Sequence, residues 1–236
     1  MRELAGFTET LRSPESKALE WHQTAMECFE ESLALFNSDD YSTKNGWKKE
    51  EEDSKTGDII YSRSMKDGKL FCIRIELAID QELFFNDLIQ SIDTEYQHNP
   101  NFEFSQRVTW LGEKSDIAHV ILKEHLMVKS RDLVTARVWR KLDDSLMIAG
   151  RSIDCHLLPP QKNRVRAELK FATARFTPSS EKAGHCIMEY LTQGDLKGWL
   201  PKSVIDAVMS KFLLQDVVIQ RNRVERLLNS KEQAEN

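Results

Sequence analysis

The stretch DLKGWLP, residues 195–201, determines how the C-terminal part of this sequence is arranged. It joins an alternating, strand-like segment to a long and unusually apolar helix that is expected from Pro201 to about Leu228. Gly198 and Pro201 favour a turn at this junction, because neither residue suits the interior of a strand or a helix. Neither flanking element has obvious catalytic groups. We therefore interpret Gly198, Trp199 and Pro201 as the hinge of a lid over a cavity, which favours carrying a small apolar molecule over transforming one.

The remaining sequence predicts an α+β domain built on one antiparallel sheet. Ser13 and Pro14 are typical of a helix start, and apolar residues then recur at helical spacing as far as Phe36. A shorter helix is expected over residues 81–92. Alternating runs separated by turn residues predict strands at 47–52, 58–63, 70–79, 102–111, 116–126, 133–141, 147–156, 165–176 and 185–193. Such a long sheet, curled on itself, would enclose a volume that the final helix could close.

Composition indicates a soluble globular protein with a single domain. The chain has 236 residues, of which 40% are hydrophobic and 30% charged. We expect an N-terminal extension at residues 1–14, one domain at 15–230 and a frayed tail at 231–236. The net charge of −5 argues against nucleic acid as a partner, because binding phosphates requires a basic surface.

The sequence also predicts a cytoplasmic location. Its four cysteines are far apart and form no CxxC pair, which is typical of reduced thiols rather than of a disulfide framework. No apolar run approaches the roughly 20 residues needed to cross a bilayer. Residues 1–12 lack the apolar core of a secretory leader and show no mitochondrial leader pattern.

Motifs for enzymatic chemistry are absent from the sequence. There is no GxSxG nucleophile elbow, no glycine-rich nucleotide loop and no HExxH pair, so we expect neither an enzyme nor a cofactor. Cys155 with His156, or His119 with His125, would be the candidates for a metal site, but isolated residues of this kind in strands are more often structural. An enzyme acting on a hydrophobic substrate is a third-ranked alternative, with Glu124, His125 and His156 as its candidates.

Arg137 is the charged residue of greatest interest. The period of a strand places it on the same face as Thr135, and that face points either into the concavity of the sheet or away from it. A guanidinium that points inward needs a partner, because an unpaired buried charge costs several kcal/mol. In an apolar cavity it could orient a ligand hydroxyl, directly or through water. The alternative is a surface ion pair across two strands.

The final helix is apolar around more of its circumference than a surface helix requires. The surplus could contact a bound lipid, a membrane or a wide core. Arg221, Arg223 and Arg226 near its end could meet anionic lipid headgroups, or could form a solvated helix end that suits the helix dipole. The apolar positions are Val204, Ile205, Val208, Met209, Phe212, Leu213, Leu214, Val217, Val218 and Ile219.

Three segments in the same order resemble START domains, the steroidogenic acute regulatory protein-related lipid-transfer family. They are SRDLVTAR at 130–137, VRAE at 165–168 and DLKGWLPKS at 195–203, and the last is similar to the sterol-binding branch. The NPN at 99–101 also matches that branch, although His98 stands where a tryptophan usually precedes it.

The resemblance covers about residues 18–228 and implies a helix-grip fold. In that fold a curved antiparallel sheet grips a long C-terminal helix and encloses a tunnel for one lipid. Arg137 would lie in the tunnel and pair with an acid on the preceding strand, near the ligand hydroxyl. Counting from His119 puts the place of that acid at Val120, which is apolar, and Glu124 lies further along the same face as the alternative partner.

By the same resemblance we expect a monomeric carrier of one sterol, such as cholesterol, or of a similar lipid. It would be peripheral to membranes, touch their surface transiently and exchange its lipid there when the lid opens, with the hinge and the loop 126–129 as moving parts. The alternative is a lipid-sensing adaptor that binds without transferring. The expected lipid-binding residues are Val120, Glu124, Met127, Thr135, Arg137, Val208, Phe212 and Leu213.

Overall fold

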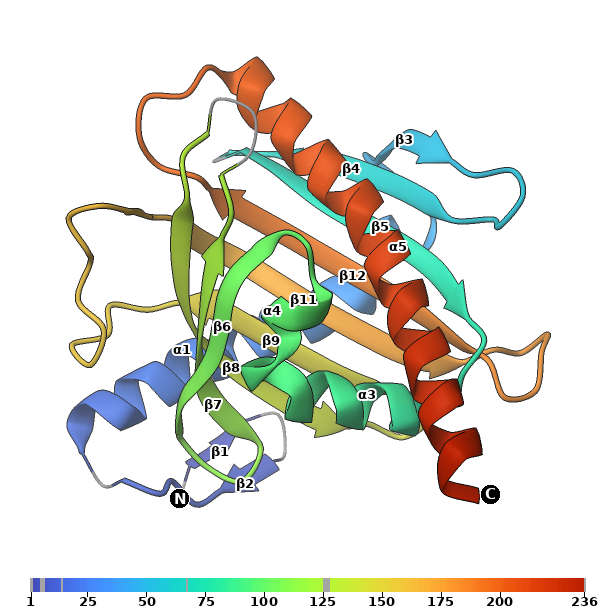
Figure 1. Ribbon diagram of the computed structural model, residues 1–236, viewed down its shortest axis with the longest axis horizontal. Helices are drawn as coiled ribbons and strands as arrows, with labels where there is room; N and C mark the ends of the chain where they lie inside the picture. The colour runs from blue at the N-terminus through green and yellow to red at the C-terminus, as the bar shows by residue number, and fades with distance from the viewer. Residues whose placement is uncertain (1, 5–6, 14, 67, 125–127, 236) are drawn as a thin grey trace.

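A computed structural model shows one long curved sheet between two helices. The first helix, α1 (Ser16–Phe36), lies behind the sheet, and the C-terminal helix α5 (Lys202–Glu235) crosses in front of it (Figure 1). The predicted α+β architecture and helix-grip arrangement are confirmed. The structure describes residues 2–4, 7–13, 15–66, 68–124 and 128–235.

The sheet follows the order β3-β4-β5-β12-β11-β9-β8-β7-β6, and β10 pairs with β8 off this path. Neighbours along the path are antiparallel, whereas β10 is parallel to β8. The pairing of β5 with β12 joins the early strands to the last one. The strands are β3 (Lys48–Glu52), β4 (Ile59–Met65), β5 (Gly68–Leu77), β6 (Phe102–Trp110), β7 (Ser115–Leu122), β8 (Arg131–Lys141), β9 (Leu146–Ser152), β10 (Val165–Arg166), β11 (Glu168–Pro178) and β12 (Cys186–Asp195).

The convex face of the sheet is covered by α1. Met26 and Phe29 on this helix are fully buried in a cluster with Val134, Ala136 and Val138 of β8. The helical spacing of the apolar residues explains this packing, since it places them along one side of α1. Alternate residues of β8 therefore face α1, and the intervening residues face the concave side. The short helix α2 (Asp39–Ser42) follows α1 directly.

The concave face is covered by α5 and by three short helical segments, α3 (Gln81–Gln90), η1 (Ser91–Asp93) and α4 (Glu95–His98). The side chain of Asp80 accepts hydrogen bonds from the first backbone N–H groups of α3, which explains where this helix begins. Phe84 of α3 is fully buried against Phe176 of β11. These elements form the second apolar cluster, on the side of the sheet opposite α1.

The C-terminal helix is longer than the sequence pattern predicted. It continues to Glu235, whereas the sequence pattern predicted an end near Leu228 and a tail at 231–236. The apolar pattern fades near Leu228, but no glycine or proline follows, and residues such as Lys231 and Glu232 are good helix formers. The helix therefore extends beyond its own apolar face. Within the described part of the chain, no helix is both long and apolar enough to cross a membrane.

The N-terminal extension contains a short hairpin that the sequence did not predict. Its strands are β1 (Arg2–Leu4) and β2 (Phe7–Glu9). The Glu9 carboxylate is buried and accepts a hydrogen bond from Arg140 Nη2 at 2.8 Å, and it lies 2.9 Å from His22 Nε2. This ionic contact holds the hairpin against α1 and the sheet.

Candidate functional site

A cavity lies between the concave face of the sheet and α5. It has two adjoining chambers, an inner chamber of about 240 Å³ beside Arg137 and an outer chamber of about 260 Å³ beside Phe212. Together they make about 500 Å³, within the range of roughly 300–1,000 Å³ of small-molecule sites. The residues that line both chambers are Asn99, Phe102, Val120, Thr135, Leu169, Tyr190 and Asp216.

Small residues on the sheet make the inner chamber possible. Gly150, Ala172 and Ala174 line it where larger side chains would fill the space. Gly150 lies directly opposite Arg137 in the ladder between β8 and β9. A Cβ atom at this position would lie 3.0 Å from the Ala136 carbonyl oxygen and 3.1 Å from Arg137 Cγ. Glycine therefore leaves room for the Arg137 side chain beside the sheet.

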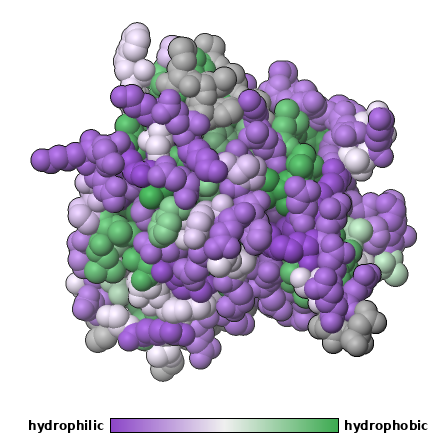
Figure 2. All heavy atoms as spheres, viewed as in Figure 1, coloured by the Kyte–Doolittle hydropathy of each residue, from purple (hydrophilic) through white to green (hydrophobic). Residues whose placement is uncertain are grey.

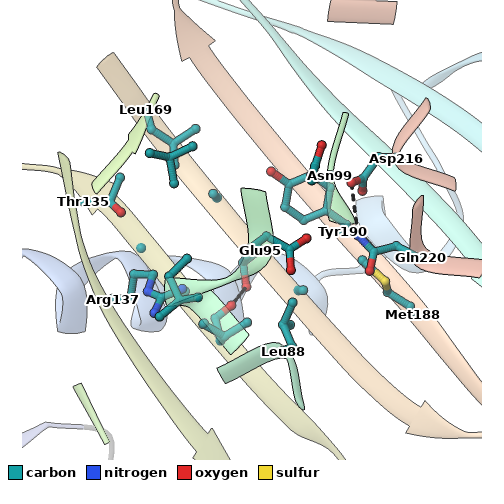
Figure 3. Close-up of a pocket in the computed structure, with 18 of the residues that line it drawn as sticks. Leu88, Glu95, Asn99, Thr135, Arg137, Leu169, Met188, Tyr190, Asp216 and Gln220 are labelled. Carbon is teal, nitrogen blue, oxygen red and sulfur yellow. Dashed lines mark hydrogen bonds between the residues drawn. The ribbon is translucent and has the colours of Figure 1, made fainter. Parts of the chain in front are cut away.

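Arg137 faces the inner chamber (Figure 3). It is paired with Asp116 on the neighbouring strand β7. Its Nε and Nη2 donate to the two oxygens of the carboxylate at 2.8 and 2.7 Å. The same carboxylate accepts from Arg107 Nε at 2.8 Å, and Asp116 is completely buried. One carboxylate thus serves two guanidinium groups, and Arg137 Nη1 has no partner among the described residues.

The sequence-based count for the acid partner of Arg137 was wrong. Asp116, rather than the position of Val120, lies opposite Arg137 in the antiparallel register of β7 and β8. Val120 pairs with Leu133 and lines both chambers. Glu124 follows the end of β7, is exposed and does not line the cavity. The register depends on the connection between the two strands, which a count along one strand does not capture.

A second polar group lies across the cavity from Arg137, on the side of α5. Asp216 of α5 is near Tyr190 of β12 and Asn99 (Figure 3). Burial raises the pKa of Asp216 to about 6, and a hydrogen bond from Gln220 Nε2 at 3.1 Å only partly opposes this rise. Burial and the neighbouring Asp216 charge raise the pKa of the Tyr190 hydroxyl to about 12. Sequence reasoning did not identify this group.

A signal for Asp216 was present in the sequence. Positions 208, 212, 216 and 220 follow one another at intervals of four residues, which places them on one face of α5. On that face Val208 and Phe212 are followed by Asp216 and Gln220, which places two polar residues on an otherwise apolar side of the helix. A carboxylate on a helix face that turns toward a cavity points to a functional group.

The predicted α5 residues have different surroundings. Phe212 and Leu213 line the outer chamber. Val208 is buried against Val128 and Leu196 and does not line either chamber. Met127 lies outside the described residues. Thr135, on β8, lines both chambers.

The surplus apolar surface of α5 is divided among three environments. Met209 faces the outer chamber, and Val217 is part of the core. Leu214 and Val218 are exposed. Figure 2 shows a hydrophobic patch over the middle of α5, surrounded by hydrophilic side chains.

The segment 195–201 is held to the sheet by Arg131. Its Nε donates to the Leu196 carbonyl oxygen at 3.2 Å, and its Nη2 to the Lys197 carbonyl oxygen at 3.4 Å. Gly198 has φ +79°, a left-handed conformation that glycine adopts without strain. Trp199 is 97% exposed, an unusual position for so large an apolar side chain. Pro201 is also exposed.

Residues considered for catalysis or metal binding are not gathered in the cavity. His156 is exposed and stacks on Trp21, and His125 lies outside the described residues. His119 is buried beside Asp132 at 3.3 Å, and burial lowers its pKa. Cys155 is buried as a free thiol. Within the described part of the chain, no group of three metal-binding side chains occurs.

The arginines near the end of α5 are engaged in ion pairs within the protein. This geometry favours a structural role for them over contact with lipid headgroups. The pairs are Arg221–Asp58 at 2.6 Å, Arg223–Asp87 at 2.6 Å and Arg226–Asp87 at 3.4 Å.

A model of a known protein family matches most of this sequence. The model for the START domain matches residues 27–230, which is most of the chain. The chain belongs to the START domain family. This START domain is 29% identical over 225 residues to the steroidogenic acute regulatory-like protein 1 of Caenorhabditis elegans, with 95% of this chain and 86% of that protein covered. It is also 29% identical to the human mitochondrial steroidogenic acute regulatory protein, with 92% of this chain and 74% of that protein covered.

Solved START structures have the same fold. Human StAR-related lipid transfer protein 5 superposes with a TM-score of 0.78 at 16% identity, covering 89% of this chain and 98% of that one. Human STARD10 gives a TM-score of 0.72 at 18% identity, covering 94% of this chain and 84% of that one. At these identities the likeness concerns the fold, and it agrees with the helix-grip arrangement described above.

Proposed function

We propose that this START domain binds one lipid in the cavity beneath α5 and transfers it between membranes. The cavity itself carries the proposal, because it is largely apolar, lies between a rigid sheet and one long helix, and has a few polar groups at defined places. The name of the human lipid transfer protein with the same fold supports this function. Transfer of this kind needs no covalent chemistry, so we propose a carrier rather than an enzyme.

The energy of such binding comes from apolar burial. Removing roughly 400 Å² of lipid surface from water stabilises the complex by on the order of 10 kcal/mol, at about 25 cal/mol per Å². This offsets much of the cost of leaving a bilayer. The exposed Trp199 beside the hinge suits transient contact with a membrane interface, where tryptophan is favoured. Opening would require α5 to move at Gly198 and Pro201.

We propose a sterol or a similar lipid as the ligand. Its hydroxyl would meet Arg137 in the inner chamber, where Nη1 is directed to no described protein group and Thr135 lies close by along the same strand. A monomeric state and a cytoplasmic location stay predictions of the same proposal. A lipid-sensing adaptor is the second candidate, because the same cavity would serve a protein that binds lipid without delivering it.

Binding and transfer can be separated by experiment. After incubation with liposomes of mixed composition, native mass spectrometry is expected to show one lipid per chain, and fluorescent sterol is expected to move between two vesicle populations faster than without protein. Binding without faster transfer would support the adaptor. Failure to bind any member of a broad lipid panel would refute both.

Replacing Arg137 by leucine is expected to weaken sterol binding by about tenfold, because a hydrogen bond to a charged group is lost. Asp116 keeps its hydrogen bond from Arg107, so the fold should persist. Competition binding would measure the change, with Arg63→Leu, a partly exposed arginine in a surface pair, as the control. A sterol lacking the hydroxyl should bind both forms equally. An equal loss for that analogue would contradict the role given to Arg137.

A further inference from the structure

The polar side of α5 differs chemically from the Arg137 side of the cavity. Arg137 presents hydrogen-bond donors and is paired with Asp116, a carboxylate that it shares with Arg107. Asp216, across the inner chamber, presents a carboxylate that only accepts while it is ionised (Figure 3). The two sides of the cavity are therefore suited to different groups of a ligand.

Gln220 is left with an unused acceptor on the same helix face. Its side-chain Nε2 donates to Asp216 Oδ1 at 3.1 Å, and its Oε1 is buried without a hydrogen-bond partner in the described protein. Gln220 is 6% exposed and lines the inner chamber. A buried acceptor without a partner is costly, and native proteins rarely leave one unsatisfied. A donor on a bound molecule would satisfy it.

The charges around Asp216 do not provide a direct counter-ion. Arg223, about two turns along α5, attracts Asp216 only weakly, and its guanidinium is bonded to Asp87 and to Glu95 of α4. Glu95 itself repels the Asp216 charge. Tyr190, facing it from β12, is an uncharged phenol at neutral pH, and its pKa is raised further to about 12. Asp216 is thus a half-buried carboxylate that lines the cavity and has no ion-pair partner among the described residues.

We propose that Asp216 and Gln220 form a second polar subsite, which binds a hydrogen-bond donor, a hydroxyl or a protonated amine, on the end of the lipid opposite the group that meets Arg137. This rests on the proposed lipid binding and narrows its ligand to an apolar body with a polar group at each end. A lipid with a carboxylate or sulfate at this second end is disfavoured, because its charge would face Asp216 in a medium of low dielectric constant.

Four ligands with one common sterol-like body test the subsite. The first has a single hydroxyl for Arg137, and the other three add a hydroxyl, an amine or a carboxylate at the far end. In competition with a fluorescent sterol at pH 7.5, the diol or the amine is expected to bind about tenfold more tightly than the single alcohol, and the carboxylate more weakly than it. Whichever of the two donors is preferred identifies the group that the subsite takes.

Substitutions of Asp216 and Gln220 test whether the preference for a second donor comes from this subsite. Asp216→Leu and, separately, Gln220→Leu should remove or reduce the advantage of the second donor while the single alcohol still binds. Asp216→Asn keeps an acceptor and should retain the diol but lose the amine. Asp143→Leu, on the surface, is the control. Because the pKa of Asp216 is about 6, any preference for the amine should decline as the pH falls from 7.5 through 6.

Two results would overturn the proposal. One is a wild-type protein that binds the single alcohol and gains nothing from either donor, and the other is a preference that survives in both leucine variants. If no member of the series binds the wild-type protein, the proposed lipid binding fails as well, so the two failures are distinguishable. If Asp216→Leu does not fold, Gln220→Leu and Asp216→Asn still test whether the preference for the second donor depends on this subsite.

Discussion

Replacing Asp116 by leucine is expected to lower the free energy of unfolding by about 3–5 kcal/mol, because it leaves two largely buried guanidinium groups without their shared carboxylate. Arg107 and Arg137 both donate to Asp116, which has no solvent exposure. An arginine side chain is always charged in a protein. Urea unfolding followed by tryptophan fluorescence would measure the loss.

A surface aspartate gives the matched control for this prediction. Asp40 pairs with Arg63 at 3.2 Å, but its side chain is 45% exposed. Asp40→Leu should therefore change stability by less than about 1 kcal/mol. Adding Arg137→Leu to Asp116→Leu should recover part of the lost stability, since one unpaired charge is then removed. Equal effects of Asp116→Leu and Asp40→Leu would contradict the central place given to Asp116.

Glu9→Gln is expected to lower the free energy of unfolding at pH 7 by about 3 kcal/mol. Burial alone would raise the pKa of Glu9, but hydrogen bonds with His22, with the backbone N–H of Lys114 and with Arg140 outweigh it and lower the pKa from 4.5 to about 2. A difference of this size between the folded and unfolded chain corresponds to about 3 kcal/mol, at roughly 1.4 kcal/mol per pH unit.

The sign of the pH dependence follows from the lowered pKa of Glu9. Its ionised form stabilises the folded state fully above pH about 4.5, and this contribution is lost as the pH falls toward 2. The difference in stability between the wild type and Glu9→Gln should therefore shrink over that range. Glu20→Gln, in an exposed pair with Lys17, is the control and should have a small effect at every pH. A constant difference between pH 7 and pH 3 would contradict the role of Glu9.

Local sequence patterns predicted most helices and strands of the fold, but they predicted the ends of these elements less well. The alternating runs correspond to strands of the sheet, and the helical spacing before Phe36 corresponds to α1. Each of these patterns involves only neighbouring residues, so it can be recognised in the sequence before the fold is known. The hairpin before α1 was missed because its two strands are only three residues each and have no alternation to detect.

The cavity was predicted only in outline. The apolar excess of α5 and the turn at Gly198 correctly indicated a helix laid across the sheet. Phe212 and Thr135 line the chambers, and their role in lipid binding stays a prediction. Asp216 escaped notice because its importance depends on which side of α5 turns toward the sheet, and an apolar helix with exposed positions such as Leu214 does not reveal that side.

The sequence by itself determined the order of the elements, the α+β class and the identity of DLKGWLP as the junction before the last helix. These follow from periodicity and from the conformational limits of glycine and proline, which act over a few residues. Only the tertiary structure decided that Asp116 is the partner of Arg137 and that Asp216 faces the cavity. Strand register and helix rotation are set by packing between segments far apart in the chain, where a shift of one residue reverses the face that each side chain occupies.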